Sequence, residues 1–467
     1  MFARKFTLLL MACCLFYQAT YACTIFTASD GKTVLVGNNE DASPSLKSNL
    51  WFYPARQHQH GFVTWGAERK LPEGGMNEKG LFWDAAALPT EIPIKRDASK
   101  PDFKGYFVDK ALSECTTVEE VVQLLGRYNL VWQQRAQILV ADAIGDYAII
   151  HANYIIRKSD KMKPYQAVAN FSLLNNKPEQ NQCHRYRTAE AMLDGQAVTE
   201  ALFKTILAKT AQHSVDNATI YSQIANLTQC KFTLFQRHRF EQPVTIVLTD
   251  ELKKGAHQVE MKSLFPLSIR EKLEPIAAKQ GAKKAVATYH RLKNAEPGGY
   301  DFGENELDEL GFALLDSGKL DQAVEIFALN QSTYPESDRA LSSLAQAYLV
   351  LGNREMAGQL FKRALSINPS NLVAGLFTSQ PDGKVTFRIS SLEYAQKISL
   401  VGSFNNWDTH ANPFTKTADG QWECKLSLKP GTYEYVFLVG DNNWMTDPGN
   451  RLASKPGQYW RSILIVH

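Results

Sequence analysis

A repeat of 34 residues is the feature that most constrains the fold of this chain. Five positions recur at this offset, with Leu310, Gly318, Ala323, Phe327 and Pro335 returning as Leu344, Gly352, Ala357, Phe361 and Pro369. This period, with a proline ending each unit, is typical of helical hairpins that stack side by side. Small alanines allow paired helices to approach, and the phenylalanines fill the space between them. A weaker half-unit precedes the two repeats, so we expect helices throughout residues 266–372.

The residues on either side of the repeat follow other periods. Residues 23–265 combine β-rich runs such as 137–141 and 147–151 with amphipathic helical segments such as 117–125, which is typical of a layered α+β domain. After about residue 382 apolar and polar residues alternate between short turns, which predicts an all-β sandwich. The chain is therefore expected to be a multidomain α+β protein. Its expected parts are 1–22, 23–265, 266–372 and 382–467.

The first 22 residues have the pattern of a secretory signal peptide. Arg4 and Lys5 precede a mostly apolar run, and the small residues Thr20 and Ala22 stand before Cys23. Cleavage there would give Cys23 a free α-amino group, whose pKa of about 7.7–8.0 lets it accept the thiol proton. We therefore expect an exported protein, periplasmic or extracellular. A lipid anchor on Cys23 is the alternative, although residues 19–22 lack the leucine that usually precedes a lipidated cysteine.

Charge and cysteine usage exclude several classes of protein. The chain has 51 basic and 48 acidic residues and no basic block, so we expect no nucleic-acid partner. No apolar run after Tyr17 approaches the ~20 residues of a membrane span. Without a CxxC motif or a histidine cluster, we expect no structural zinc, and no metal or organic cofactor is implied. Four cysteines besides Cys23 remain after the signal peptide, and their pairing is left open.

Several short motifs follow one another in a recognisable order. They are Cys23-Thr-Ile-Phe, Gly37-Asn-Asn-Glu-Asp41, Gly75-Met-Asn-Glu-Lys-Gly-Leu81, Ala167-Val-Ala-Asn170 and His184-Arg185-Tyr186. Together they resemble the N-terminal-nucleophile (Ntn) amidohydrolases, in particular the choloylglycine hydrolase and penicillin V acylase group of linear-amide C–N hydrolases. The resemblance covers about 240 residues. It implies an αββα sandwich and hydrolysis of an amide bond in a small N-acyl substrate.

The resemblance also implies a role for four residues. Cys23 would attack the carbonyl carbon and form an acyl-thioester that water then hydrolyses. Asp41 would hold the amino group of Cys23 through a charge-assisted hydrogen bond. Asn170 would donate to the oxyanion, and Arg185 would keep the site electropositive and favour the thiolate.

The sequence departs from the family pattern at two positions. The family arginine of Gly-Arg-Asn is Asn38 here, and the position of a second oxyanion asparagine falls on Ala87. Bile-salt and penicillin V specificity therefore stay open. Asn77 is interpreted as a turn residue rather than a catalytic one.

The C-terminal segment contains motifs of a second family. Val401-Gly-Ser-Phe-Asn-Asn-Trp407, Gly420-Gln-Trp422, Leu428-Lys-Pro-Gly-Thr-Tyr-Glu-Tyr435, Trp444 and Asp447-Pro448 follow in order. They resemble the glycogen-binding module of AMP-activated kinase β subunits, an immunoglobulin-like sandwich. By this resemblance Trp407 and Trp444 would stack on the apolar faces of sugars, whereas Trp422 would lie in the core. A sandwich that only supports the enzyme is the alternative.

The hypothesis is an exported cysteine-nucleophile amidohydrolase with an accessory module for an α-glucan or another glycan. The repeats resemble tetratricopeptide repeats, which implies a surface for a protein partner. Two alternatives remain open. An amine instead of water could intercept the thioester, which would make the protein an acyltransferase. The replacements at Asn38 and Ala87 also allow a non-catalytic, surface-associated binding protein with a degenerate hydrolase domain.

Overall fold

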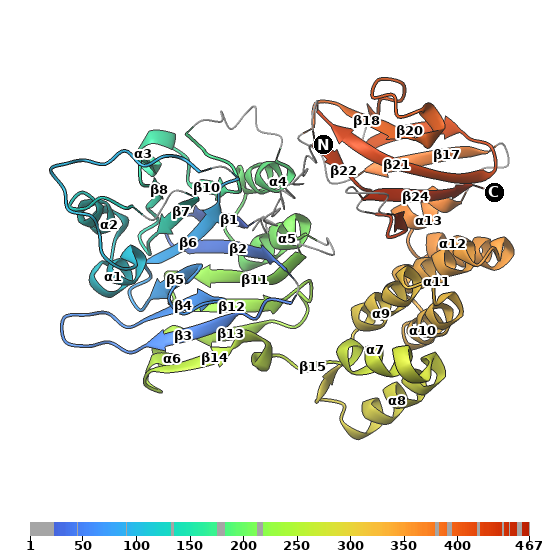
Figure 1. Cartoon of the computed structure of the whole chain (residues 1–467), viewed down its shortest axis with the longest axis horizontal. Coiled ribbons are helices and arrows are strands. Elements are labelled where there is room, and N and C mark those ends of the chain that lie inside the picture. Colours follow the sequence, from blue (N-terminus) through green and yellow to red (C-terminus); the bar gives the residue numbers. More distant parts are fainter. Residues whose placement is uncertain are drawn as a thin grey trace, which may run out of the picture.

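The computed structural model (Figure 1) describes residues 23–466 with internal gaps. The undescribed residues are 1–22, 44, 90, 132–134, 175–182, 213–217, 379–382, 390–394, 418–420, 441–442, 448, 455–459 and 467. The expected signal peptide lies outside the described residues.

Two stacked β-sheets form the framework of the N-terminal part. The first has the order β10-β1-β2-β11-β12-β13: Tyr165–Val168, Thr24–Ser29, Val34–Ala42, Ala218–Asn226, Lys231–Gln236 and Val244–Val247. The second has the order β14-β3-β4-β5-β6-β7-β8-β9: His257–Glu260, Asn49–Tyr53, Phe62–Gly66, Gly74–Asn77, Phe82–Ala87, Ala136–Ala141, Tyr147–His151 and Tyr154–Arg157. All neighbouring strands in both sheets are antiparallel.

Helices cover the outer faces of both sheets. On the first sheet, α4 (His184–Leu193) and α5 (Glu200–Thr210) bury Tyr186 and Phe203 in the core that the two sheets share. On the second sheet, α1 (Phe107–Glu114) and α2 (Val118–Leu125) pack against Trp83 in a separate cluster. The short helices α3 (Lys158–Lys161) and α6 (Leu248–Leu252) complete this part. The layered α+β arrangement predicted for residues 23–265 is therefore confirmed.

Antiparallel helices occupy the region of the repeat. They are α7 (Ile269–Gln280), α8 (Ala282–Ala295), α9 (Glu304–Asp316), α10 (Leu320–Thr333), α11 (Asp338–Val350) and α12 (Arg354–Ile367), followed by α13 (Leu372–Phe377). The repeated Gly318 and Gly352 have φ angles of 72° and 82°, which only glycine adopts without strain, and they end α9 and α11. The expected hairpins are present, and their tetratricopeptide character stays a prediction.

Short elements that the sequence pattern did not indicate join this region to the first. The 3₁₀ helix η2 (Met261–Leu264) leads into β15 (Leu267–Ser268), which pairs in parallel with β16 (Tyr300–Asp301). Strands were not expected here; two residues are too few to show an alternating pattern.

Two further sheets form the C-terminal part. One has the order β17-β20-β19: Lys384–Ile389, Trp422–Ser427 and Thr415–Lys416. The other has the order β18-β21-β24-β23, with β22 also on β21: Ile398–Gly402, Gly431–Val439, Arg461–Val466, Ala453–Ser454 and Asn443–Met445. A 3₁₀ helix, η3 (Ser403–Asn405), follows β18. The predicted two-sheet sandwich is confirmed, and Trp422 lies in its core.

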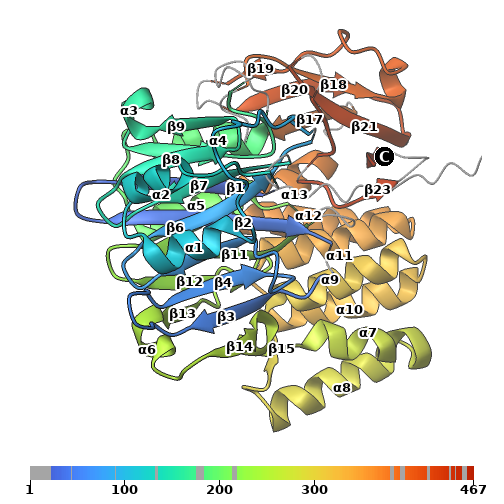
Figure 2. The ribbon, with the colours of Figure 1, turned by 60° about the vertical axis from the view of Figure 1, so that its left-hand side comes forward.

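The sandwich and the last helices share one hydrophobic core. Leu341 of α11, Phe361 of α12 and Phe377 of α13 belong to the same buried cluster as Phe387 and Phe437 of the sandwich. Figure 2 shows the helices stacked beneath the sandwich and beside the two large sheets. The last helices of the repeat region therefore pack directly on the sandwich.

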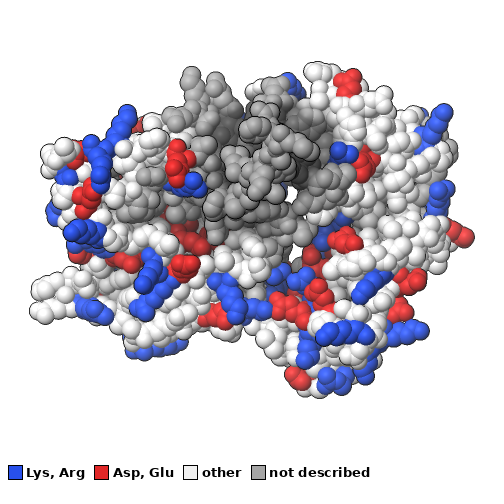
Figure 3. Space-filling model, in the orientation of Figure 1, with Lys and Arg blue, Asp and Glu red and all other residues white. Residues whose placement is uncertain are grey.

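The surface carries both signs of charge. On the face seen in Figure 3, blue and red side chains are interspersed among the described atoms without an extended patch of one sign. In the described part of the chain, no helix has the length and apolar character needed to cross a bilayer.

Candidate active site

Cys23 lies immediately before β1 and faces a carboxyl group. Thr24 pairs with Asn39 across β1 and β2, so the antiparallel register places Cys23 opposite Glu40. The Cys23 Sγ donates a hydrogen bond of 3.0 Å to Glu40 Oε1. Both side chains are buried, with 3% of Cys23 and 1% of Glu40 exposed. The thiol is thus held by a direct contact with a carboxyl oxygen inside the protein.

Arg185 brings the predicted site residues together. It lies in the first turn of α4, and its Nη1 donates to the Cys23 carbonyl oxygen at 2.9 Å and to Thr24 Oγ1 at 2.7 Å. The same nitrogen lies 3.2 Å from Asp41 Oδ2, and Nη2 donates to Asn170 Oδ1 at 2.9 Å. One guanidinium therefore links Cys23, Asp41 and Asn170, three residues taken from separate sequence motifs.

Asp41 is fully buried on the helix-facing side of β2. Gln212 Nε2 donates to its Oδ2 at 2.6 Å, and the Thr219 hydroxyl donates to its Oδ1. Burial raises the pKa of Asp41 to about 6, although Arg185 and these two donors favour its ionised form. Gln212 and Thr219 were not foreseen from the sequence.

Asn170 is fixed by hydrogen bonds at both ends of its amide. Its Oδ1 accepts from Arg185, and its Nδ2 donates to the carbonyl oxygen of Ala87 at 2.9 Å. Ala87 is the position where the family pattern would place a second oxyanion asparagine. Here that position contributes a backbone acceptor to Asn170.

Carboxyl groups surround the thiol on the side between the sheets. The pKa of Cys23 is raised well above its usual value, first by burial and then by Glu40, Asp41 and Asp84. The pKa of Glu40 is also raised, by burial and by the neighbouring Glu73 and Asp84. The expectation that Arg185 makes the surroundings of the thiol electropositive is therefore wrong. The guanidinium binds the Cys23 backbone, whereas acidic groups face the sulfur.

Asn38, which replaces the family arginine, belongs to this acidic side. Its Nδ2 donates to Asp84 Oδ2 at 3.1 Å, and Trp65 Nε1 donates to the same oxygen at 3.0 Å.

No group of three or more histidine, cysteine or acidic residues among those described is arranged to hold a metal ion.

Asn77 organises the turn between β5 and β6. Its Nδ2 donates to the carbonyl oxygens of Leu112 and Cys115, and its Oδ1 accepts from the backbone N–H groups of Lys79 and Leu81. The interpretation of Asn77 as a turn residue is confirmed.

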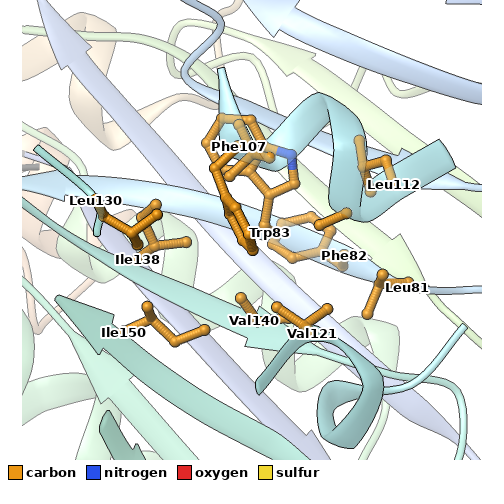
Figure 4. A pocket seen from close by; sticks show the side chains of 12 residues that line it. Leu81, Phe82, Trp83, Phe107, Leu112, Val121, Leu130, Ile138, Val140 and Ile150 are labelled. Carbon is orange, nitrogen blue, oxygen red and sulfur yellow. The ribbon is translucent and has the colours of Figure 1, made fainter. Parts of the chain in front are cut away.

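Two of the cavities among the described residues lie in the N-terminal part. The first, between α1, α2 and the second sheet (Figure 4), is lined by apolar side chains such as Trp83 and Leu112 and has a volume of about 10 Å³. An apolar void of this size is a packing feature rather than a ligand site. The second, of about 810 Å³, is open and is bordered by Tyr53, Arg69 and Arg135.

The two tryptophans predicted to bind sugar lie on one face of the sandwich. Trp407 packs on Val401, Val436 and Leu438, and the Arg461 guanidinium lies over its ring at 4.3 Å. Trp444 of β22 is opposite Leu438 in the register, and 52% of it is exposed. The structure therefore places both indoles on the side of the sheet that faces away from its core.

Two family models match this chain. Residues 27–224 match the model described as acyl-coenzyme A:6-aminopenicillanic acid acyl-transferase. Residues 385–466 match the model described as the glycogen recognition site of AMP-activated protein kinase. The N-terminal part is thus similar to an Ntn acyltransferase family, and the C-terminal part is similar to a glycogen-recognition module.

Two curated relatives match a short segment of this chain and a small part of their own length. The 1,4-alpha-glucan-branching enzyme of Emericella nidulans is 45% identical over 56 residues, and that of Lactobacillus acidophilus is 46% identical over 54 residues. Each match covers 12% of this chain and 8% of the relative.

Solved structures resemble the chain at low sequence identity. Two variants of conjugated bile acid hydrolase from Clostridium perfringens are 14% and 15% identical, with a TM-score of 0.41 for each. They cover 51% and 52% of this chain and 96% of their own length. Penicillin V acylase from Agrobacterium tumefaciens is 15% identical, with a TM-score of 0.40, and covers 50% of this chain and 90% of its own.

Proposed function

We propose that this protein is an exported amidohydrolase in which the Cys23 thiol cleaves a linear, non-peptide C–N bond. The observation that carries the proposal is the network in which Arg185 joins the Cys23 backbone to Asp41 and Asn170. A fixed network of this kind orients a nucleophile without reorganisation during the reaction. The family model matched by residues 27–224 supports acyl-transfer chemistry for the same part of the chain.

The reaction has two steps. The Cys23 sulfur attacks the carbonyl carbon of an N-acyl substrate, the C–N bond breaks, and the amine leaves with a proton. Water then attacks the thioester, releases the acid and restores the thiol. Arg185 holds Cys23 and Asn170 in fixed positions relative to each other. We assign the Asn170 side-chain amide as the hydrogen-bond donor to the developing oxyanion.

Intact mass measurement and a substrate panel test this proposal. The exported protein should begin at Cys23, and an N-acyl amide should leave an acyl adduct on that residue together with turnover. Cys23→Ser should abolish both, because the hydroxyl lacks a thiolate's nucleophilicity. Cys230→Ser is the matched control, since Cys230 is a free thiol remote in sequence from the site. An acylated Cys23 amine, or turnover that survives Cys23→Ser, would refute the proposal.

Acyl transfer is a second candidate because the matched model describes an acyltransferase. The two reactions share the thioester and differ in what intercepts it. Adding a candidate amine during turnover and measuring the ratio of new amide to free acid separates them. Free acid alone supports hydrolysis, and predominant new amide supports transfer.

Glycan binding is the function that we propose for the C-terminal sandwich. It is supported by the glycogen-recognition match and by the exposed ring of Trp444 on the same face as Trp407. Because Arg461 covers Trp407, we assign most of the contact with the glycan to Trp444.

Trp444→Ala should weaken binding of a soluble α-glucan by roughly threefold to tenfold, which corresponds to a stacking contact of about 0.5–1.5 kcal/mol. His410→Ala, on an exposed neighbouring loop, is the control. Equal affinities of wild type and Trp444→Ala would favour a purely supporting sandwich.

A further inference from the structure

Strand alternation divides the motif 37–41 between two environments. Asn39 and Asp41 face the helices, where Asn39 Nδ2 donates to the Leu207 carbonyl oxygen at 3.0 Å. Asn38 and Glu40 face the space between the sheets, where Asn38 bonds Asp84 and Glu40 bonds Cys23. The residue that touches the sulfur is therefore Glu40, whereas Asp41, which the motif singles out, lies on the opposite side of the strand.

One carboxyl oxygen of Glu40 accepts a hydrogen bond from the Cys23 thiol, and the other has no described partner. Its Oε1 accepts from the thiol, and no described residue gives its buried Oε2 a hydrogen-bond partner. A buried carboxyl oxygen without a partner is costly to keep, so such groups are often retained at functional sites. Glu40 lies directly opposite Cys23 in the β1–β2 pairing, so the register of the two strands determines this contact.

We propose that Glu40 is a catalytic residue that accepts the thiol proton of Cys23, in place of the α-amino group. This inference rests on the proposed amidohydrolase function. In the first step the S–H proton moves to Glu40 Oε1 as the sulfur electron pair attacks the carbonyl carbon. The protonated Glu40 then gives that proton to the departing nitrogen as the C–N bond breaks. In the second step Glu40 takes a proton from the attacking water and returns it to the sulfur when the C–S bond breaks.

The surroundings of Glu40 suit this role. An ordinary carboxylate is a weak base toward a thiol, because its pKa lies several units lower. Burial and the nearby Glu73 and Asp84 raise the pKa of Glu40, which makes it a stronger base than an ordinary carboxylate. The other groups that act on this pair are Asp41, which is ion-paired with Arg185 on the far side of β2, and the buried Tyr221 of β11, which pairs with Glu40.

Glu40→Gln tests the inference through two measurements that should move in opposite directions. The variant removes a negative charge that raises the thiol pKa and keeps an oxygen that can accept from the thiol, so Cys23 should ionise at lower pH than in the wild type. Turnover should nevertheless fall by about 10²–10⁴-fold, the usual contribution of a general base. The thiol pKa is read from thiolate ultraviolet absorbance against a Cys23→Ala blank.

Asp109→Asn is the matched control. It removes a half-buried carboxyl of α1 whose Oδ1 has no described partner and which does not act on Cys23 or Glu40, so turnover should stay of the same order. If Glu40→Gln does not fold, Glu40→Asp retains the charge, withdraws the carboxylate by one methylene, and should also lower turnover.

Each outcome separates the inference from the proposed function. Wild-type turnover in Glu40→Gln would overturn the role of Glu40 and leave the α-amino group of Cys23 as the acceptor. If the wild type turns over no amide, the proposed function fails. In that case the thiol titration alone tests the contact between Cys23 and Glu40. A lowered thiol pKa in Glu40→Gln supports a proton shared between the thiol and Glu40, and an unchanged thiol pKa refutes it.

Discussion

At the scale of single residues, Arg185 is the connection on which the candidate site depends. Its side chain is 14% exposed, and its two terminal nitrogens reach a backbone carbonyl, a hydroxyl, a carboxylate and an amide oxygen. Only a planar guanidinium has enough donors in a fixed fork to satisfy all four acceptors. The position is therefore specific for arginine rather than for positive charge.

Arg185→Lys tests this specificity. The ammonium group keeps the charge but cannot bond Asn170 and Asp41 in the same geometry. We expect turnover of an N-acyl amide to fall by about 10²-fold or more, as when one oxyanion donor is lost. Arg187→Lys is the control, because residues two apart lie on opposite faces of a helix. Unchanged turnover in Arg185→Lys would show that charge alone suffices.

The sequence predicted the parts of the site that lie inside contiguous motifs. Cys23, Asp41, Asn170 and Arg185 do come together, because each is placed by a strand end or a helix start that its motif defines. Glu40 could have been found from strand alternation alone, since it pairs across from Cys23. Gln212 and Asp84 could not, because their relation to Asp41 and Asn38 depends on packing between distant segments.

At the scale of elements, glycines of the helical region divide into packing and solvent-facing positions. Gly311 of α9 lies under the Phe327 ring of α10, and a Cβ at this position would come within 2.5 Å of a ring carbon. Gly358 of α12 has no atom within 4 Å of that place. The two helical glycines therefore form a matched pair for measuring helix packing.

Alanine at these two glycines should have opposite effects. Gly311→Ala forces α9 and α10 apart and should lower the free energy of unfolding by about 1–3 kcal/mol. Gly358→Ala should raise it by roughly 0.5–1 kcal/mol, since alanine favours an open helical position. Urea unfolding of both variants checks this. A stabilised Gly311→Ala would contradict the close approach of the two helices.

Long elements were predictable where a period persists over several turns or strands. The 34-residue spacing fixed the order of α9 to α12, because each unit contains its own turn glycine. The β15–β16 pair contains two residues per strand and joins the segment before α7 to the segment before α9. No local pattern specifies such a pair.

At the scale of the whole molecule, a buried ion pair joins the first part to the helical region. Arg239 Nη1 lies 2.6 Å from Asp301 Oδ2, and 8% and 2% of the two side chains are exposed. Asp301→Ala leaves the buried guanidinium with the more distant Glu306 at 3.9 Å and the uncharged Gln236 as partners, so we expect a loss of about 3–5 kcal/mol in unfolding free energy. The exposed pair Arg451–Glu309 is the control, and Glu309→Ala should cost at most about 1 kcal/mol. Equal losses of unfolding free energy in Asp301→Ala and Glu309→Ala would show that the buried pair stabilises the protein no more than the exposed pair.

The response of stability to pH depends on carboxyl groups in all three regions. Burial raises the pKa of Asp41, Asp308 and Asp447 to about 6 each, above the usual value of 3.8. A raised folded-state pKa means that the folded protein binds more protons, so this contribution is complete below about pH 4 and is lost as the pH rises through 6. The half-buried His238 opposes it, because burial lowers its pKa and protonation favours unfolding. Because the carboxyls with raised pKa values outnumber His238, the free energy of unfolding should be higher at pH 5 than at pH 8, by roughly 2 kcal/mol or more. Urea unfolding at both pH values and constant ionic strength measures the difference, and Asp308→Asn should reduce it. Greater stability at pH 8 would contradict the assignment of these buried carboxyls.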